Sequence, residues 1–315
     1  GKLGGGELNV DSDVDLCFFY ATDDGTVGDS EITVHEHFAK IASRCSRALG
    51  DVTEHGFVFR VDLRLRPEGS RGPLVNSLAS AERYYTTYGR AWERAALLRA
   101  RPIAGDPLFG EELLDAIRPF IFRHAVDPGI AKAMGEMLER SRRELAVDGE
   151  RDVKLGAGGI REAEFFIQGL QLVWGGRHPE LQVAGTVEGA RRLLALGLLS
   201  EREEQALTTA WALLRRVEHR VHIQTAYQTH AIPEAGPARE TFARSLGYAD
   251  AATFERALSS ARADVTALFA SLTTDDEATS HDDSALADRV AAGATAAELA
   301  REVGDTLGAA DPHEA

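Results

Sequence analysis

The chain has 315 residues, 44% of them hydrophobic, which is enough for two domains that each bury a core. Its net charge of −15 argues against non-specific nucleic-acid binding, and no apolar run reaches the roughly 20 residues that cross a bilayer. Two cysteines, Cys17 and Cys45, favour reduced buried thiols over a disulfide framework, so we expect a cytoplasmic protein.

The first segment, GKLGGGELNVDSDVDLCFFY, predicts a glycine-rich turn followed by a strand that carries Asp13 and Asp15. Residues two apart in a strand point the same way, so the two carboxylates share a face. Like charges this close repel unless a cation lies between them, which favours Mg²⁺. Gly4 and Gly5 would let the backbone approach a phosphate. The alternative is that these aspartates only form turns and caps.

A helix over residues 32–49 precedes a second charged strand, GFVFRVDLRLRP. Its alternation places Arg60, Asp62, Arg64 and Arg66 on one face. Asp62 would complete a three-carboxylate site for metal ions, where two metals can assist displacement at phosphorus. Arg64 and Arg66 are weaker candidates for holding phosphate. The alternatives are a solvated charged face, or arginines that pair with nearby acids as a brace.

The remaining sequence predicts helices, with a domain boundary near residue 107. This divides the chain into a domain at 1–106, a helical bundle at 107–273 and an acidic, Ala-rich linker at 274–315. The predicted helices cover residues 81–99, 110–122, 128–145, 160–174, 187–199, 201–227, 237–246 and 251–272. In the longest, apolar residues from Leu207 to Val221 recur at three- and four-residue intervals, which indicates a face that packs in a core.

A glycine-rich loop around Gly158 precedes the helix at 160–174, with Lys154 before it and Arg161 in the first turn. A helix amino terminus offers unpaired N–H groups to an anion, so Lys154 and Arg161 are candidate phosphate ligands. The alternative is that the glycines only shape the loop. His219 lies between Glu218 and Arg220 on a predicted helix, and we expect surface ion pairing there.

The order Gly-Gly, Asp-x-Asp and a later lone Asp is similar to the nucleotidyltransferase superfamily that includes DNA polymerase beta. More narrowly, the first segment, FRVDLRLRPEGSRGPLVNSL, YYTTYGRAWERAALLRAR and KLGAGGIREAEFFIQGLQL resemble the bacterial glutamine synthetase adenylyltransferase family. The resemblance implies an α+β fold, with a polymerase-beta-like nucleotidyltransferase domain built on a mixed sheet and an all-α helical bundle after it. The lysine-and-glycine segment is also similar to the helical domain of PII uridylyltransferases.

That family has two similar halves, one attaching AMP to a tyrosine of glutamine synthetase and one removing it. Residues 89–94 and 158–162 resemble the amino-terminal, adenylyl-removing half, and we expect a fragment that lacks residues at both ends. The resemblance implies that Asp13, Asp15 and Asp62 hold Mg²⁺ while phosphate attacks adenylyl-tyrosine and ADP leaves. The expected partners are glutamine synthetase, a PII-type regulator and phosphate, ADP or ATP, without nucleic acid or membrane. The alternatives are ATP-dependent adenylylation, PII uridylyl transfer, or a catalytically silent fragment that binds regulator or substrate.

Overall fold

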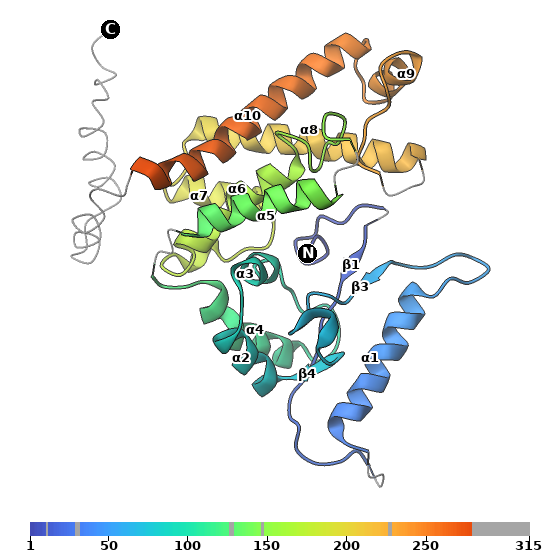
Figure 1. Cartoon of the computed structure of the whole chain (residues 1–315), viewed down its shortest axis with the longest axis vertical. Helices are drawn as coiled ribbons and strands as arrows, with labels where there is room; N and C mark the ends of the chain where they lie inside the picture. Colours follow the sequence, from blue (N-terminus) through green and yellow to red (C-terminus); the bar gives the residue numbers. More distant parts are fainter. Residues whose placement is uncertain (11, 29–31, 126–128, 146–147, 226–228, 279–315) are drawn as a thin grey trace.

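The computed structural model describes residues 1–10, 12–28, 32–125, 129–145, 148–225 and 229–278. An amino-terminal part, residues 1–125, carries the strands and four helices, and a helical part, residues 129–278, carries six helices among the residues described. Figure 1 shows the two parts as two layers, with the first residues of the chain lying between them. The predicted α+β class is confirmed.

The strands form two short parallel pairs. Strand β1 (Val14–Asp15) pairs with β3 (Val61–Asp62), and β2 (Phe18–Tyr20) pairs with β4 (Val75–Ser77). The expected mixed sheet is therefore present only as two parallel ladders within the described residues.

The predicted strand over the charged segment is too long. Strand β3 ends at Asp62, and the chain then turns into a short 3₁₀ helix, η1 (Gly69–Arg71). The Arg66 guanidinium stabilises this turn by donating to the carbonyls of Leu63 at 2.7 Å and Gly72 at 3.2 Å. Arg66 therefore does not share a strand face with Asp62.

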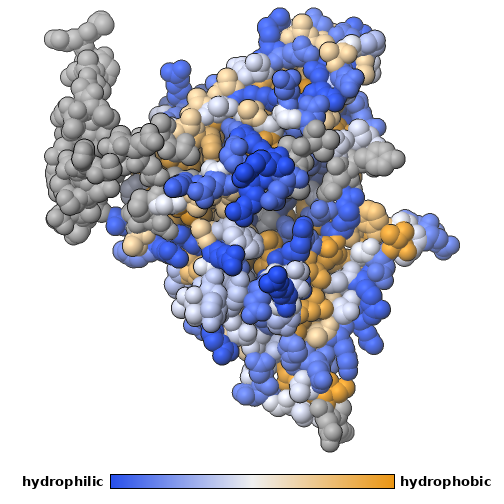
Figure 2. Space-filling model, viewed as in Figure 1, coloured by the Kyte–Doolittle hydropathy of each residue, from blue (hydrophilic) through white to orange (hydrophobic). Residues whose placement is uncertain are grey.

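Helix α1 (Val34–Gly50) begins at a capping box in which Thr33 and Glu36 bind each other's backbone N–H groups. It lies at the edge of the molecule, and its predicted apolar face is only partly covered, with Phe38 36% and Ile41 41% exposed. Figure 2 shows further apolar residues at the surface on this side of the molecule. Cys45 on the same helix is exposed, so the expectation of a buried thiol was wrong there.

The helix predicted at 81–99 is two helices, α2 (Leu78–Thr87) and α3 (Ala91–Leu97). They separate at Gly89, where a Cβ atom would overlap the Phe120 ring, and at Arg90, which is extended and caps α3. Helix α4 (Pro107–Ile121) starts at Asp106, whose side chain accepts from the Leu108 N–H at 2.9 Å. Helix α4 packs against α2 and α3, across the predicted domain boundary.

The helical part follows the predicted order closely. Its elements are α5 (Gly129–Leu145), α6 (Ile160–Trp174), the 3₁₀ helix η2 (Pro179–Leu181), α7 (Thr186–Ala195), α8 (Glu201–Thr225), α9 (Pro237–Ser245) and α10 (Ala251–Ala278). Helix α10 continues past residue 273, so the first residues assigned to the acidic linker are helical. The rest of the expected linker, residues 279–315, lies outside the described residues. None of the described helices is long and apolar enough to pass through a lipid bilayer.

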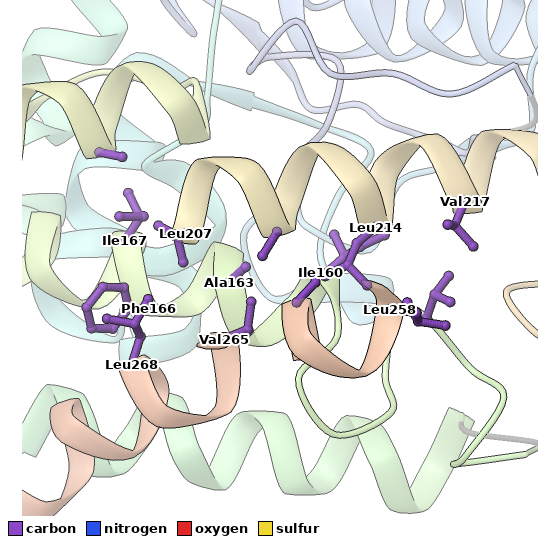
Figure 3. Packing of buried hydrophobic residues seen from close by; sticks show 14 of the residues in the cluster. Ile160, Ala163, Phe166, Ile167, Leu207, Leu214, Val217, Leu258, Val265 and Leu268 are labelled. Atoms are coloured by element: carbon purple, nitrogen blue, oxygen red, sulfur yellow. The ribbon is translucent and has the colours of Figure 1, made fainter. Parts of the chain in front are cut away.

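Helix α6 is shared by two hydrophobic cores. Figure 3 shows Ile160 and Phe166 of α6 packed with residues of α8 and α10 in the core of the helical part. Phe165 and Leu172 of the same helix lie in the other core, with buried residues of α2 to α5. Because each such side chain contributes about 1.5–3 kcal/mol when buried, α6 holds the two parts together.

Candidate active site

Of the three predicted acids, Asp15 lies on strand β1, Asp13 lies just before it, and Asp62 lies on β3. Parallel pairing sets Asp15 opposite Asp62, and paired residues of neighbouring strands point to the same face. Asp13 precedes β1 and is held by Arg60, whose Nε lies 2.8 Å from Asp13 Oδ1. The structure therefore pairs Asp15 with Asp62 on the ladder and places Asp13 immediately before it.

The charges of these acids influence one another. Burial raises the pKa of Asp15, and the carboxylates of Asp62 and Asp13 raise it further. The amino group of residue 1 and the Arg161 guanidinium lower it, but by less. The pKa of Asp62 is lowered because Arg64 binds it, with Arg64 Nε 2.9 Å from Asp62 Oδ2. Arg64 and Asp62 thus form the brace that the sequence left as an alternative to phosphate binding.

Carboxylate oxygens are the ligands that Mg²⁺ prefers, so this donor set fits a hard divalent cation. The three aspartates are neighbours but do not converge, since two of them are turned to Arg60 and Arg64. Among the described residues, the group of three potential ligands with all donor atoms within 4.8 Å of one another is Glu218, His222 and His230. Glu218 in that group is already bound to Lys2 and Arg215.

A cavity of about 390 Å³ opens beside Asp13 and Asp15, and Asp62 is not among the residues that line it. Asp13, Asp15 and Arg64 line it from the amino-terminal part. The helical part contributes a wall of polar side chains that includes Lys154, Arg161, Glu164, Gln168, His222 and His230. A pocket of this size, between two parts of a protein and with convergent charged groups, is typical of a ligand site.

Gly4 and Gly5 lie outside this lining. A Cβ atom on Gly4 would overlap the Arg99 carbonyl, and one on Gly5 would overlap the Arg99 side chain. Close packing against Arg99 is thus a structural reason for both glycines, and a phosphate contact by them stays a prediction. Arg66 binds backbone carbonyls of its own loop and is not among the cavity residues.

The glycine-rich loop places Lys154 and Arg161 in the cavity wall. Gly158 has a φ of +64° and lies against the backbone of Arg262, so the turn into α6 needs a glycine at that position. Lys154 Nζ lies 3.3 Å from His230 Nε2, and the Arg161 guanidinium lies 5.0 Å from the centre of the Phe165 ring.

Four residues of the site were not predicted. Lys2 Nζ lies 3.0 Å from Glu218 Oε1 on α8, and His230 Nδ1 lies 3.4 Å from the same oxygen. His222 Nε2 lies 3.3 Å from His230 Nδ1. These contacts join residues up to 216 positions apart, and no local sequence pattern signals them. His219, expected in a surface ion pair, instead contacts Asn9 Oδ1 at 2.8 Å.

Comparisons with known proteins match the amino-terminal part and the helical part to two different family models. Residues 1–116 match the family model "Glutamate-ammonia ligase adenylyltransferase", and residues 130–273 match "GlnD PII-uridylyltransferase", as the lysine-and-glycine resemblance predicted.

Three curated relatives carry the name "Bifunctional glutamine synthetase adenylyltransferase/adenylyl-removing enzyme". The one from Xanthomonas oryzae pv. oryzae is 44% identical over 86% of this chain and 29% of its own length. Those from Thioalkalivibrio sulfidiphilus (45% identical) and Chromobacterium violaceum (44% identical) match 82% and 85% of this chain, and 27% and 30% of their own lengths. The chain thus spans less than a third of these relatives, and with this similarity along most of its residues it belongs to the family of bifunctional glutamine synthetase adenylyltransferase/adenylyl-removing enzymes.

Proposed function

We propose that this chain carries a nucleotidyl-transfer site that removes AMP from adenylyl-tyrosine of glutamine synthetase by Mg²⁺-dependent phosphorolysis, releasing ADP. The observation that carries the proposal is Asp15, which lines a cavity with cationic side chains in its wall and lies opposite Asp62 on a parallel ladder. The printed names of the relatives supply the protein substrate and the two possible directions. The motifs at 89–94 and 158–162 favour the removing direction.

Asp13, Asp15 and Asp62 would hold the cation. Mg²⁺ bound there would withdraw charge from the phosphate oxygens of the AMP group. The carboxylates are adjacent, and Arg60 and Arg64 can release Asp13 and Asp62 because both arginines lie at the surface, with side chains 38% and 79% exposed. Catalysis of this kind depends on positioning and charge stabilisation, so no covalent enzyme intermediate is needed.

The test measures ADP released from adenylylated glutamine synthetase as phosphate and Mg²⁺ are titrated. We expect Asp15→Asn to lower the rate at least 100-fold, because the amide removes a charged metal ligand from the pair. Asp115→Asn is the matched control, since that side chain is 69% exposed and pairs with Arg118 on the surface of α4.

Two results would contradict the proposal. Equal rates for the wild type and Asp15→Asn would show that the Asp15 carboxylate takes no part in the reaction. AMP transfer from ATP to unmodified glutamine synthetase, without ADP release in the phosphate assay, would assign the opposite direction to this site.

A further inference from the structure

The helical wall of the cavity holds two cations that no described carboxylate contacts directly, although Glu164 in the same wall attracts both through space. Lys154 and Arg161 form no ion pair within 4 Å in the part of the chain that the structure describes, although both line the cavity. The polar contact of Lys154 Nζ is the imidazole of His230, and Arg161 Nε is buried without a hydrogen-bond partner. Burying a cation without a counter-charge is costly, so an anion would be stabilised here.

The carboxylates nearest to this wall are already engaged. Glu218 is fully buried between Lys2 and Arg215, and Glu164 faces Arg99, with 3.5 Å between Arg99 Nη1 and Glu164 Oε1. Burial lowers the pKa of Lys154, Lys2 and Arg161 lower it further, and Glu218 and Glu164 oppose them. The effect of the two cations is larger than that of the two carboxylates, which favours an anionic ligand beside Lys154.

The position of the wall relative to the acids restricts which anion fits. Asp13 and Asp15 line the same cavity as Lys154 and Arg161, so the acids and the cations border the same space. A ligand that spans both would place the AMP phosphate beside the acids and a second phosphate beside Lys154 and Arg161. A lysine point charge and an arginine fork are well suited to phosphate oxygens.

We propose that Lys154 and Arg161, with Lys2 beside them, form the subsite for inorganic phosphate, which becomes the β-phosphate of ADP. The inference rests on the proposed function and deepens it. An oxygen of HPO₄²⁻ forms a bond to the α-phosphorus as the bond between that phosphorus and the tyrosine oxygen breaks. The tyrosine oxygen takes the electron pair and the proton that HPO₄²⁻ loses, so tyrosine and ADP are the products.

The test compares the binding of AMP, ADP and inorganic phosphate by calorimetry, with a chelator present so that no metal contributes. AMP lacks the β-phosphate and ADP has it. We expect Lys154→Ala to weaken ADP and phosphate about 10- to 100-fold and AMP less than threefold, as for the loss of one hydrogen bond to a charged group. Arg161→Lys, which keeps the charge and loses the fork, should weaken ADP by a smaller factor.

Arg244→Ala is the control, because Arg244 is 67% exposed and pairs with Glu240 on α9, away from the cavity lining. Thermal melting of each variant shows whether it is folded. Equal losses of AMP and ADP affinity in Lys154→Ala, or phosphate binding that neither variant changes, would overturn the inference. Its failure is distinguishable from failure of the proposed function, because the binding comparison uses no metal and no turnover.

Discussion

His230 is a partly buried histidine between groups of opposite charge. Lys154 and His222 contact its ring nitrogens. Glu218 lies 3.4 Å from Nδ1 and also forms an ion pair with Lys2. The pKa of His230 is lowered from its ordinary value of 6.5 to about 3, chiefly by burial and next by the charge of Lys154, against the opposing charge of Glu218. The ring is therefore neutral at physiological pH, which lets it accept a hydrogen bond from Lys154.

This histidine predicts a loss of stability in mild acid. The unfolded chain takes up the proton near pH 6.5 and the folded chain only near pH 3, so acidification between these values favours unfolding. From pH 7 to pH 5 we expect the free energy of unfolding to fall about 2 kcal/mol more in the wild type than in His230→Gln. Urea unfolding at the two pH values measures this difference.

His55→Gln is the control for that experiment, because the His55 side chain is 89% exposed. It should follow the wild type at both pH values. An acid-induced loss in His230→Gln as large as that of the wild type would show that other groups cause it. The pH 5 limit stays above the range in which Glu218 contributes, since its pKa falls from 4.5 in the unfolded chain to about 2 in the folded one.

The sequence predicted the adjacency of the three aspartates but not what binds them. Their spacing and the period of two place Asp13 and Asp15 on one face, and the parallel ladder adds Asp62. The pairing of Arg60 with Asp13 and of Arg64 with Asp62 depends on which rotamers the strand ends allow. Periodicity carries no information on that choice, so brace and phosphate ligand were equally compatible with the sequence.

At the scale of elements, the turn into α6 depends on Gly158. Its φ of +64° is a conformation that other residues adopt at a cost of about 1 kcal/mol, and a Cβ atom there would overlap the backbone of Arg262 on α10. We expect Gly158→Ala to lower the free energy of unfolding by about 3 kcal/mol, because α10 has to move as well. Chemical denaturation measures the change.

Gly197 offers a matched comparison. It has a φ of +71°, and its Cβ position is open, with no atom within 4 Å. Gly197→Ala should therefore cost only the backbone strain, about 1 kcal/mol. Similar losses in the two variants would mean that the Arg262 contact adds nothing at Gly158.

Helices were predicted better than strands, for a physical reason. An amphipathic helix such as α6 repeats its pattern over several turns, and its predicted bounds, 160–174, agree with the structure. The paired part of β3 is two residues long, which is too short for a period of two to mark its end. The separation of α2 from α3 depends on Gly89 packing against Phe120 of α4, a contact outside both helices.

At the scale of the whole molecule, the first nine residues connect the two parts. Glu7 binds Arg99 on the amino-terminal side, and its Oε1 accepts from the Thr186 N–H of α7 at 2.7 Å. Its carbonyl accepts from Arg215 of α8. These contacts, like those of Lys2, were invisible in the sequence because they depend on how distant segments fold onto one another.

Glu7 is therefore expected to contribute strongly to stability. Glu7→Ala leaves Arg99, whose side chain is 6% exposed, with an incomplete set of partners, and we expect a loss of about 3 kcal/mol in the free energy of unfolding. Glu188→Ala removes a surface pair with Arg192 and should cost no more than about 0.5 kcal/mol. If urea unfolding gives both variants the same small loss, the contacts of Glu7 do not stabilise the molecule.

Because α6 belongs to two cores, its helical module cannot be freely exchanged for that of a relative. Phe165 and Leu172 of α6 share a core with α2 to α5, of which α2 and α3 lie in the stretch matched by one family model, whereas α6 itself lies in the stretch matched by the other. A helical module transplanted from a distant relative would have to bring side chains that fill the same space as Phe165 and Leu172. A substitution that changes the shape of one module at this core therefore requires a compensating change in the other, although the two modules match different family models.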